Sequence, residues 1–343
     1  MKLINKIIEV IKKDSFIYLD DFLKIVLRDE NYGYYVNQNP IGQEGDFITA
    51  PEVSQLYGEI LALSIVNKIH KNKIKNFNLI ELGPGKGTLM LDIVRVFNKT
   101  LENGTNYSIH FNEINHKYRS VLERHFPNSK FHQNFKEFPQ NYSIIIANEF
   151  FDALPMCQLT SINSKFYEKV VKINKNEELF FDKHLARERL VNKIRNNKSP
   201  YKNSVYEVSE ETNNIFTDLL KLIQENGGFI FIADYGYIQP TYKSTLQSIS
   251  KNKKTEILKN LGRQDITYHV NFDQLITIAK ELGLKKVQIN TQSNYLKMNG
   301  INIRAEKLIN SNPNKSDEII SQLSRLTDPD KMGNLFKILE VEF

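Results

Sequence analysis

Apolar residues recur with two different periods along this chain. In the first 70 residues they have helical spacing, and Leu3, Ile7 and Ile11 share one face of a first helix. From Asn78 onward, short apolar runs alternate with helical segments, which is typical of a parallel sheet. The runs predict strands at 78–82, 107–113, 130–132, 143–147, 229–233, 284–289 and 335–343. The pattern therefore favours the α/β fold class.

The alternation breaks in the middle of the chain. Residues 166–173 and 178–181 are typical of a hairpin, and a charged helix is expected over 184–196. We interpret 157–205 as an accessory insertion. The expected organisation is a helical N-terminal cap over 1–75, a sheet domain built from 76–156 and 206–343, and the insertion between its two parts.

Composition narrows the class of protein further. The 46 basic and 40 acidic residues give a net charge of +6, which permits an acidic partner but does not require one. Cys157 is the only cysteine, so no internal disulfide forms and a reducing compartment is expected. No apolar run reaches the roughly 18 residues of a membrane span. The first residues lack the features of a signal or transit peptide, so we expect a cytoplasmic protein.

The segment 78–92 has the most informative pattern. A buried strand ends in Glu81 and Leu82, and Gly83, Gly85 and Gly87 then make a tight turn into a helix. The turn has Thr88 where a dinucleotide site has its third glycine, and it lacks the P-loop spacing. An acidic residue before three spaced glycines is instead the pattern of S-adenosylmethionine (SAM) sites. A plain strand–turn–helix remains the alternative.

Other candidate residues follow the predicted strands, where open α/β sheets bind ligands. Glu113 ends the second strand and is well placed for ribose hydroxyls, with a solvated strand end as the alternative. Strand 143–147 runs into Asn148, Glu149, Phe150 and Asp152, a dense group of polar and aromatic side chains that also contains possible helix N-caps. Two further positions are less specific: Asp234 fits a bland turn as well as a site, and His269 is either a base or a structural histidine. No cluster has zinc spacing, so no metal is expected.

Two segments are candidates for lids over this edge of the sheet. Residues 42–55 include Asp46 and Phe47, and Thr49 with Glu52 predicts a capping box at the start of a helix. Residues 235–270 are too long for a simple connection, and such long segments are usually functional. We expect the two segments to close over the site from opposite sides.

With these segments considered together, the chain resembles the MidA family of class I SAM-dependent methyltransferases. That family includes the mitochondrial methyltransferase that assists respiratory complex I assembly. The resemblance covers nearly the whole chain and lies in segments 32–35, 45–55, 81–89, 147–155, 234–236, 245–247, 265–272, 291–292, 300–301 and 332–339. Lys86, Asn115, His116 and Asn271 depart from residues common in the family, which have Arg, Ser, Pro and Asp there.

The resemblance implies a Rossmann-like seven-stranded sheet with a helical N-terminal cap. It also implies SAM as the cofactor, held by Glu81, Gly83, Gly85, Gly87 and Glu113, and methylation of arginine in a protein such as a complex I subunit. In that reaction Asn148, Glu149 and Asp152 would be the catalytic residues. The substrate and lid residues would be Asp46, Phe47, Thr49, Glu52, Phe150, Asp234 and His269.

In this reaction the methyl group is already activated, so the protein mainly has to align the acceptor with it. Methyl transfer is an in-line displacement, and carboxylates such as Glu149 and Asp152 pair with a planar guanidinium. Two other functions remain open: methylation of a small molecule or RNA, and a non-catalytic assembly factor that binds SAM. The sequence shows no basic stripe beside the site, so no nucleic-acid partner is expected.

Overall fold

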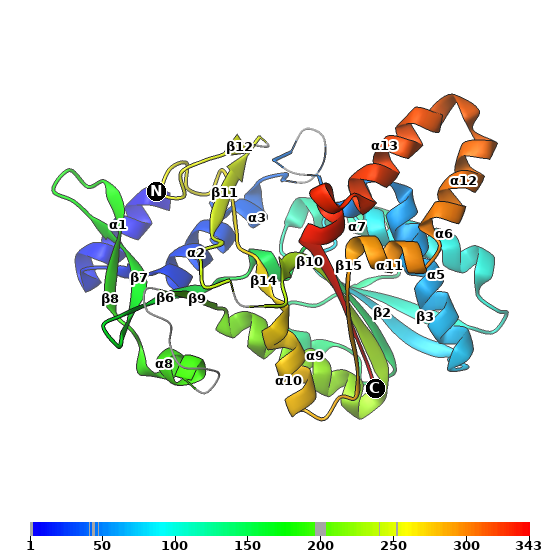
Figure 1. Cartoon of the computed structure of the whole chain (residues 1–343), viewed down its shortest axis with the longest axis horizontal. Helices are drawn as coiled ribbons and strands as arrows, with labels where there is room; N and C mark the ends of the chain where they lie inside the picture. The colour runs from blue at the N-terminus through cyan, green and yellow to red at the C-terminus, as the bar shows by residue number, and fades with distance from the viewer. Residues whose placement is uncertain are drawn as a thin grey trace.

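The computed structural model describes residues 3–40, 42, 45–46, 48–195, 204–239, 241–251 and 253–343. Figure 1 shows a large twisted sheet with helices on both faces, beside a smaller accessory lobe that contains the N-terminal helices and a second sheet. Among the described residues, no helix is long and apolar enough to cross a membrane.

The large sheet has the order β15-β16-β10-β5-β2-β3-β4. Its strands are β2 (Asn76–Leu82), β3 (Asn106–Asn112), β4 (Lys130–Phe131), β5 (Ser143–Asn148), β10 (Gly228–Tyr237), β15 (Lys286–Thr291) and β16 (Phe336–Glu342). β16 runs antiparallel to both of its neighbours, and the other pairs on this path are parallel. A short β14 (Val270–Asn271) also pairs with β10. The expected seven-stranded path is thus confirmed within the described residues.

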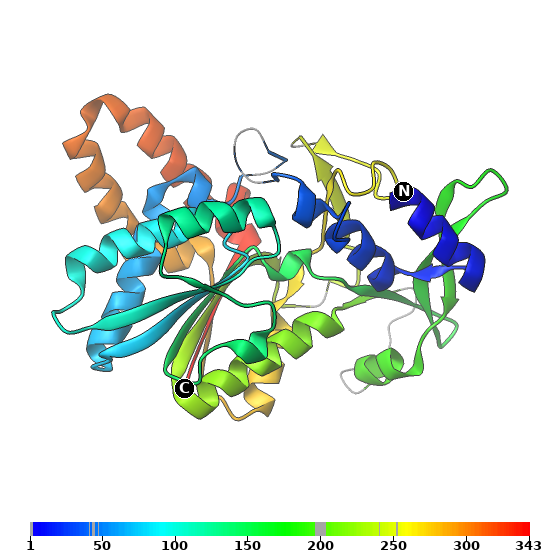
Figure 2. The ribbon, with the colours of Figure 1, turned by 180° about the vertical axis from the view of Figure 1, so that it is seen from behind.

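Two layers of helices bury the two faces of this sheet. Neighbouring residues of β2 point to opposite sides, with Leu79 in one apolar cluster and Ile80 in the other. One layer is α5 (Gln55–Lys71), α6 (Thr88–Thr100), α7 (His116–His125), α11 (Gln292–Met298), α12 (Ile301–Ser311) and α13 (Ser316–Thr327). The other is α9 (Glu210–Asn226) and α10 (Phe272–Glu281), and Figure 2 shows the sheet between the layers from behind. Burial on both faces explains the continuous apolar runs of the strands.

The accessory lobe has its own sheet of order β1-β7-β6-β9, with β8 paired to β7. Its elements are α1 (Leu3–Asp14), β1 (Ile17–Tyr18), α2 (Leu19–Arg28), β6 (Cys157–Ile162), β7 (Lys165–Ile173), β8 (Leu179–Leu185), α8 (Glu188–Arg195) and β9 (Val205–Val208). The expected hairpin is confirmed as the antiparallel pair β7–β8. The helix after it begins at Glu188 rather than 184, because residues up to 185 continue the strand.

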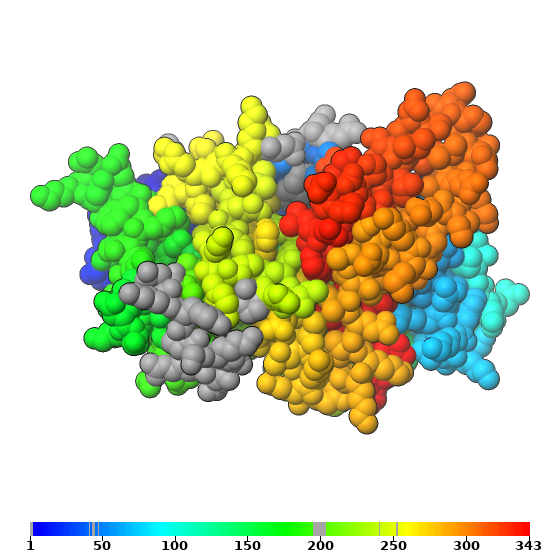
Figure 3. Space-filling model, viewed as in Figure 1, coloured from blue at the N-terminus to red at the C-terminus, as the bar shows by residue number. Residues whose placement is uncertain are grey.

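The N-terminal residues contribute to both parts of the molecule. β1 pairs with β7 of the accessory lobe, whereas α5 packs on the large sheet. The boundaries expected at 75, 156 and 206 therefore stay a prediction. A third, three-stranded sheet consists of β11 (Gln247–Ser250), β12 (Lys253–Lys254) and β13 (Asp265–Thr267). In Figure 3, this yellow segment lies between the green accessory sheet and the orange and red C-terminal helices.

Short elements connect these layers. They are α3 (Tyr34–Asn37), α4 (Ala50–Val53), η1 (Phe135–Glu137), η2 (Phe151–Ala153), η3 (Pro313–Lys315) and η4 (Pro329–Gly333). The buried Asn115 caps α7 by accepting from the N–H groups of Lys117 and Tyr118, and its Nδ2 donates to the carbonyls of Tyr35 and Gln38 at 2.9 Å. This side chain therefore fastens α3 to the end of the large sheet.

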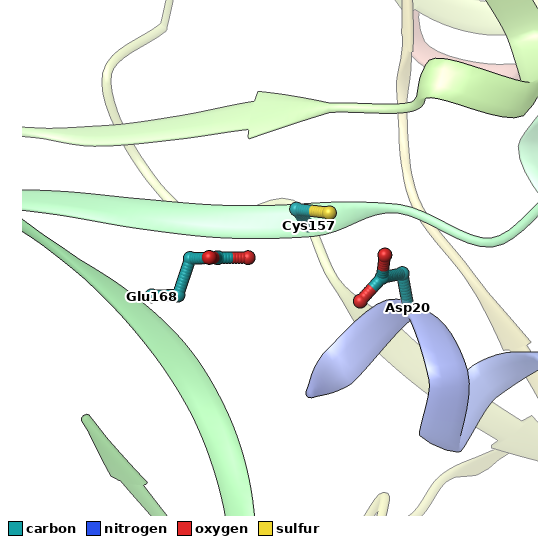
Figure 4. A group of neighbouring side chains, drawn as sticks. All are labelled: Asp20, Cys157 and Glu168. Carbon is teal, nitrogen blue, oxygen red and sulfur yellow. The ribbon is translucent and has the colours of Figure 1, made fainter. Parts of the chain in front are cut away.

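One guanidinium holds the accessory lobe together. Asp20, Cys157 and Glu168 converge from α2, β6 and β7, as Figure 4 shows, with ligand-type atoms within 4.8 Å of one another. Among the described residues this is the one group with the composition of a metal site. Arg187 Nη2 donates to Asp20 at 2.9 Å, to Glu168 at 2.6 Å and to Cys157 Sγ at 3.3 Å. The positive charge that such a group requires is thus supplied by Arg187.

We expect Arg187→Gln to destabilise the accessory lobe by about 3 kcal/mol, because the buried Glu168 would lose its counter-charge. Amide exchange should accelerate in β6 and β7. The matched control is Lys259→Gln, which removes an exposed ion pair with Glu256 and should leave exchange unchanged. Exchange in β7 that is the same in Arg187→Gln and in the wild type would contradict this role.

Candidate active site

The turn after β2 brings its backbone close to neighbouring side chains. Gly83, Gly85 and Gly87 all have positive φ, of 61°, 55° and 80°, which favours glycine. A Cβ at Gly87 would lie 2.6 Å from Leu122 of α7, so this glycine serves helix packing. A Cβ at Gly83 would lie 3.0 Å from the ring of Phe150. The turn therefore packs against α7 at Gly87 and against Phe150, after β5, at Gly83.

A cavity opens at the carboxyl ends of β2, β3 and β5. Its empty volume, which includes the open solvent in front of it, is about 1220 Å³. The residues singled out in the sequence that line it are Glu81, Gly83, Gly85, Glu113, Asn148, Glu149, Phe150, Thr49 and Glu52. The structure thus brings together side chains from three strand ends and from the segment before α5.

Glu81 has a buried oxygen without a partner. Its side chain lines the cavity, the residue is 3% exposed, and Oε2 accepts no hydrogen bond from the protein. Burial raises the pKa of this carboxyl to about 8, with a further contribution from Glu113. An unsatisfied buried carboxylate oxygen at a cavity wall suits a ligand that carries a positively charged donor.

Glu113 sits one residue beyond β3 and is held by backbone donors. Its Oε2 accepts from the N–H of Gly85 at 3.1 Å, and its Oε1 accepts from the N–H of Asn115 at 2.7 Å. Burial raises the pKa of Glu113 to about 7, although these backbone bonds act in the opposite direction. The carboxylate is thereby fixed across the glycine turn, with lone pairs left for a ligand's hydroxyl groups.

Glu149 is held in a strained backbone conformation at the end of β5. Its φ of 51° is unusual for a residue with a side chain, and its N–H donates to the carbonyl of Ala233 at 2.8 Å. Its Oε1 accepts from the N–H of Ala50 at 3.0 Å. Asn148 Oδ1 accepts from the Tyr57 hydroxyl at 2.7 Å. Burial raises the pKa of Glu149 to about 8.

The capping box expected at Thr49 and Glu52 does not form. Thr49 occupies the N-cap position of α4, but its side chain makes no capping bond. The Ala50 N–H is satisfied by Glu149, and Glu52 accepts a hydrogen bond from the hydroxyl of Thr88. The N–H of Glu52 donates to the Thr49 carbonyl at 3.0 Å, so only the Glu52 side chain has exchanged its local partner for a distant one. Thr49 and Glu52 both line the cavity.

Three more buried carboxylates lie behind Glu149. Asp234 accepts from the N–H groups of Phe151, Asp152 and Tyr235 at 3.0, 3.2 and 2.9 Å, so it shapes the η2 turn. Asp152 is 5% exposed, and its Oδ1 has no partner. Asp265 accepts from the Tyr35 hydroxyl at 2.6 Å.

The environment of these carboxylates favours their neutral forms. Burial raises the pKa of Asp152 to about 6 and of Asp265 to about 8, and it raises that of Asp234 as well. Within the described part of the chain, no lysine or arginine forms a salt bridge with any of these three aspartates or with Glu149. These acids therefore lack a counter-ion of their own, and a cation placed among them would favour their ionised forms.

Sequence reasoning missed several residues of this site. Tyr35 lines the cavity and Asp265 lies behind it, yet they are far apart in the chain. Gln133 and Phe135 also line the cavity and follow β4, so the rule of strand ends would have identified them had it been applied to that strand. No local signal pointed to Tyr35 and Asp265 as a pair.

Some candidate residues lie outside the cavity lining. Asp46 accepts from the Tyr34 hydroxyl and the Lys251 N–H, both at 2.7 Å, and thereby joins the two candidate lid segments. His269 lines a second cavity between α9 and α10, where its N–H donates to Thr245 at 2.9 Å. Asp152, Asp234 and Gly87 lie behind the lining. Phe47 is outside the described residues, and whether the segments move as lids stays a prediction.

We expect Asp265→Asn to stabilise the fold at alkaline pH. The folded protein keeps the Asp265 proton up to about pH 8, whereas the unfolded chain releases it near pH 4, so wild-type stability falls across that window. Asparagine cannot ionise and still accepts the Tyr35 hydroxyl. Urea unfolding should show a more stable variant at pH 9 and a smaller difference at pH 4. Asp330→Asn, at an exposed position, should match the wild type, and equal stability of Asp265→Asn and the wild type at pH 9 would refute the expectation.

Comparison with known proteins agrees with this geometry. Residues 60–290 match the family described as "Putative S-adenosyl-L-methionine-dependent methyltransferase". The protein arginine methyltransferase NDUFAF7 of Danio rerio is 30% identical over 94% of this chain and 82% of its own length. The Xenopus tropicalis protein of the same name is 29% identical over 99% of this chain and 85% of its own length.

A solved structure has the same fold. The protein from Burkholderia thailandensis bound to S-adenosyl-homocysteine superposes with a TM-score of 0.86 at 19% identity, over 99% of this chain and 92% of its own. The expected SAM-dependent methyltransferase and its cofactor are thus confirmed by the family match. The chain belongs to the family of S-adenosyl-L-methionine-dependent methyltransferases that includes these NDUFAF7 proteins.

Proposed function

We propose that this methyltransferase modifies an arginine side chain of a protein, such as a subunit of respiratory complex I. The observation that carries the proposal is the cluster of Glu149, Asp152, Asp234 and Asp265. Burying carboxylates without a cation is costly, so the cluster favours an acceptor that brings a positive charge. A planar guanidinium meets this need with paired hydrogen bonds. The NDUFAF7 relatives, named as protein arginine methyltransferases, agree with this substrate class.

The residues at the glycine turn fit the cofactor. The orphaned Glu81 Oε2 suits a cationic amino group, and Glu113 suits ribose hydroxyls. Gly83 and Gly85 allow close approach because no Cβ intervenes. When bound, S-adenosyl-L-methionine supplies an activated methyl group, so the protein mainly has to orient the acceptor and exclude water.

The residues after β5 would orient the acceptor. Glu149 would pair with the guanidinium, Asp152 would lie behind Glu149, and the ring of Phe150 would form the wall beside the acceptor. The acceptor nitrogen gains a carbon and must lose a proton. Glu149, with its raised pKa, is suited to take that proton on its carboxylate. Thr49, Glu52 and the Asp46 contact would hold the opposite side of the cavity.

The compartment is a further part of this proposal. Cys157 is a buried free thiol, and Arg187 contacts its sulfur. A reduced thiol beside a guanidinium is compatible with a reducing compartment, and we infer the cytoplasm of the host cell.

Cofactor binding is the first test. Glu113→Gln should weaken SAM binding by about 1–3 kcal/mol, because a neutral amide loses charge-assisted bonds to hydroxyl donors. Gly85→Val should abolish binding, since a side chain would fill the ligand's place. Calorimetry measures both variants, and Glu123→Gln at an exposed site on α7 serves as the control. If Gly85→Val binds SAM like the wild type, the cofactor site lies elsewhere.

Acceptor chemistry is the second test. The wild type should methylate arginine in host proteins and peptides but not lysine, as detected by mass spectrometry. Glu149→Gln should keep SAM affinity within about threefold and lower kcat by roughly a hundredfold, since an orienting and proton-accepting group is lost. Normal turnover by Glu149→Gln would show that the carboxylate is structural. Methylation of lysine, RNA or a small molecule without arginine would overturn the arginine assignment.

A further inference from the structure

Two residues of the cavity lining form an ion pair with each other. Arg28 and Glu211 both line the cavity, and the Arg28 guanidinium donates to the Glu211 carboxylate. Arg28 is in the last turn of α2 in the accessory lobe, and Glu211 is in the first turn of α9 beside the large sheet. Among the described lining residues, this is the one ion pair with both partners in the cavity wall.

An apolar wall leads from this pair toward the buried acids. Ile215 lies one turn along α9 from Glu211, and Ala153 and Phe150 continue the lining to Glu149. An arginine side chain has an aliphatic stem and a charged head, which fit an apolar passage that ends in carboxylates. With the head at Glu149, the rest of the acceptor would lie along this lining, which also contains Arg28 and Glu211.

The two members of the pair differ in how firmly they are held. Glu211 has a short side chain on a helix whose neighbouring residues Thr212, Ile215 and Phe216 are buried. Its position in the first turn also suits a negative charge. Arg28 has a long, adaptable side chain at a helix end, and water reaches both partners, since 24% of the Arg28 side chain and 35% of the Glu211 side chain are exposed. A competing cation can therefore displace Arg28 into water while Glu211 stays in place.

The titratable groups of the cavity lining decide which kind of substrate residue can replace Arg28 beside Glu211. Its described lining has five carboxyl groups, Glu52, Glu81, Glu113, Glu149 and Glu211, against two cations, Arg28 and Lys86. Burial raises the pKa of Glu81, Glu113 and Glu149; a cation that enters the cavity favours the ionised forms of these groups, whereas an acidic residue disfavours them. The lining thus favours replacement of Arg28 by a basic residue of the substrate.

We propose that Glu211 is a specificity-determining residue that selects a protein substrate with a second basic residue near the methylated arginine. In the free enzyme, Arg28 occupies the place of that second residue. This inference rests on the proposed arginine methylation and adds a sequence preference to it. Glu211 does not contact the reacting atoms, so its effect should appear in KM rather than in kcat.

The test uses peptides with one acceptor arginine and a lysine moved through the flanking positions, up to about three residues away. At one position, lysine should lower KM about three- to fivefold relative to alanine, as a half-exposed ion pair allows. Glu211→Gln should lose this preference and keep kcat. Glu210→Gln is the matched control, because Glu210 pairs with Arg189 and Lys193 and lies outside the cavity lining.

Reversing the charges of the Arg28–Glu211 pair distinguishes substrate selection by Glu211 from a purely structural role of the pair. The double variant Arg28→Glu with Glu211→Arg restores an ion pair, so a purely structural role predicts the wild-type preference for lysine. The proposal instead predicts a preference for glutamate at the same position. Should Glu211→Gln fold poorly, Arg28→Ala gives a second test, because a freed Glu211 should strengthen the lysine preference.

The possible failures are distinguishable. If arginine peptides are methylated but lysine confers no advantage, or Glu211→Gln keeps that advantage, Glu211 does not select substrates and the proposed function stands. If no arginine peptide is methylated although SAM binds, the proposed function fails and this inference falls with it. Melting temperature and SAM affinity of each variant confirm that the protein compared is folded.

Discussion

The cost of burying carboxylates without a counter-ion governs the architecture around the active site. Four acids lie at the carboxyl ends of β5 and β10 and beside β13, and the protein offers them only neutral donors. These donors are tyrosine hydroxyls and backbone N–H groups, which must be aimed correctly to be of use. The η2 turn around Asp234 and the start of α4 at Glu149 are arranged to provide them. In the accessory lobe, by contrast, Arg187 supplies a positive charge to Asp20 and to the buried Glu168.

The need for these donors also explains why both the accessory lobe and the large sheet contribute residues to the site. Tyr35 comes from the N-terminal region, Asp265 from the small sheet of β11–β13, and Glu149 from the end of β5. Asn115 connects the same N-terminal region to the end of β3, next to Glu113. The same N-terminal segment thus supports both the cofactor side and the acceptor side of the cavity. A displacement of α3 would alter the surroundings of both at once.

The local sequence pattern predicted the structure wherever a single hydrophobic period or a single backbone requirement dominates. The strands were predictable because burial on both faces imposes continuous apolar runs, and the turn was predictable because its positive φ values require glycine. Prediction failed where distant partners decide. Tyr35 and Asp265 are 230 residues apart, and the Glu52 side chain expected in the capping box instead accepts from Thr88, 36 residues away. Such hydrogen-bond partners come close only in the folded chain, so no short stretch of the sequence predicts these contacts.

The place of β16 has a consequence for how this protein is made. The last strand of the chain lies between β10 and β15, so the sheet has a gap until the final residues arrive. A growing polypeptide must keep the hydrogen-bonding edge of β10 uncovered through the synthesis of about a hundred further residues. Loss of β16 would leave that edge exposed, with an apolar strand position unfilled. The two halves of the sheet are therefore joined only once residues 336–342 have been made.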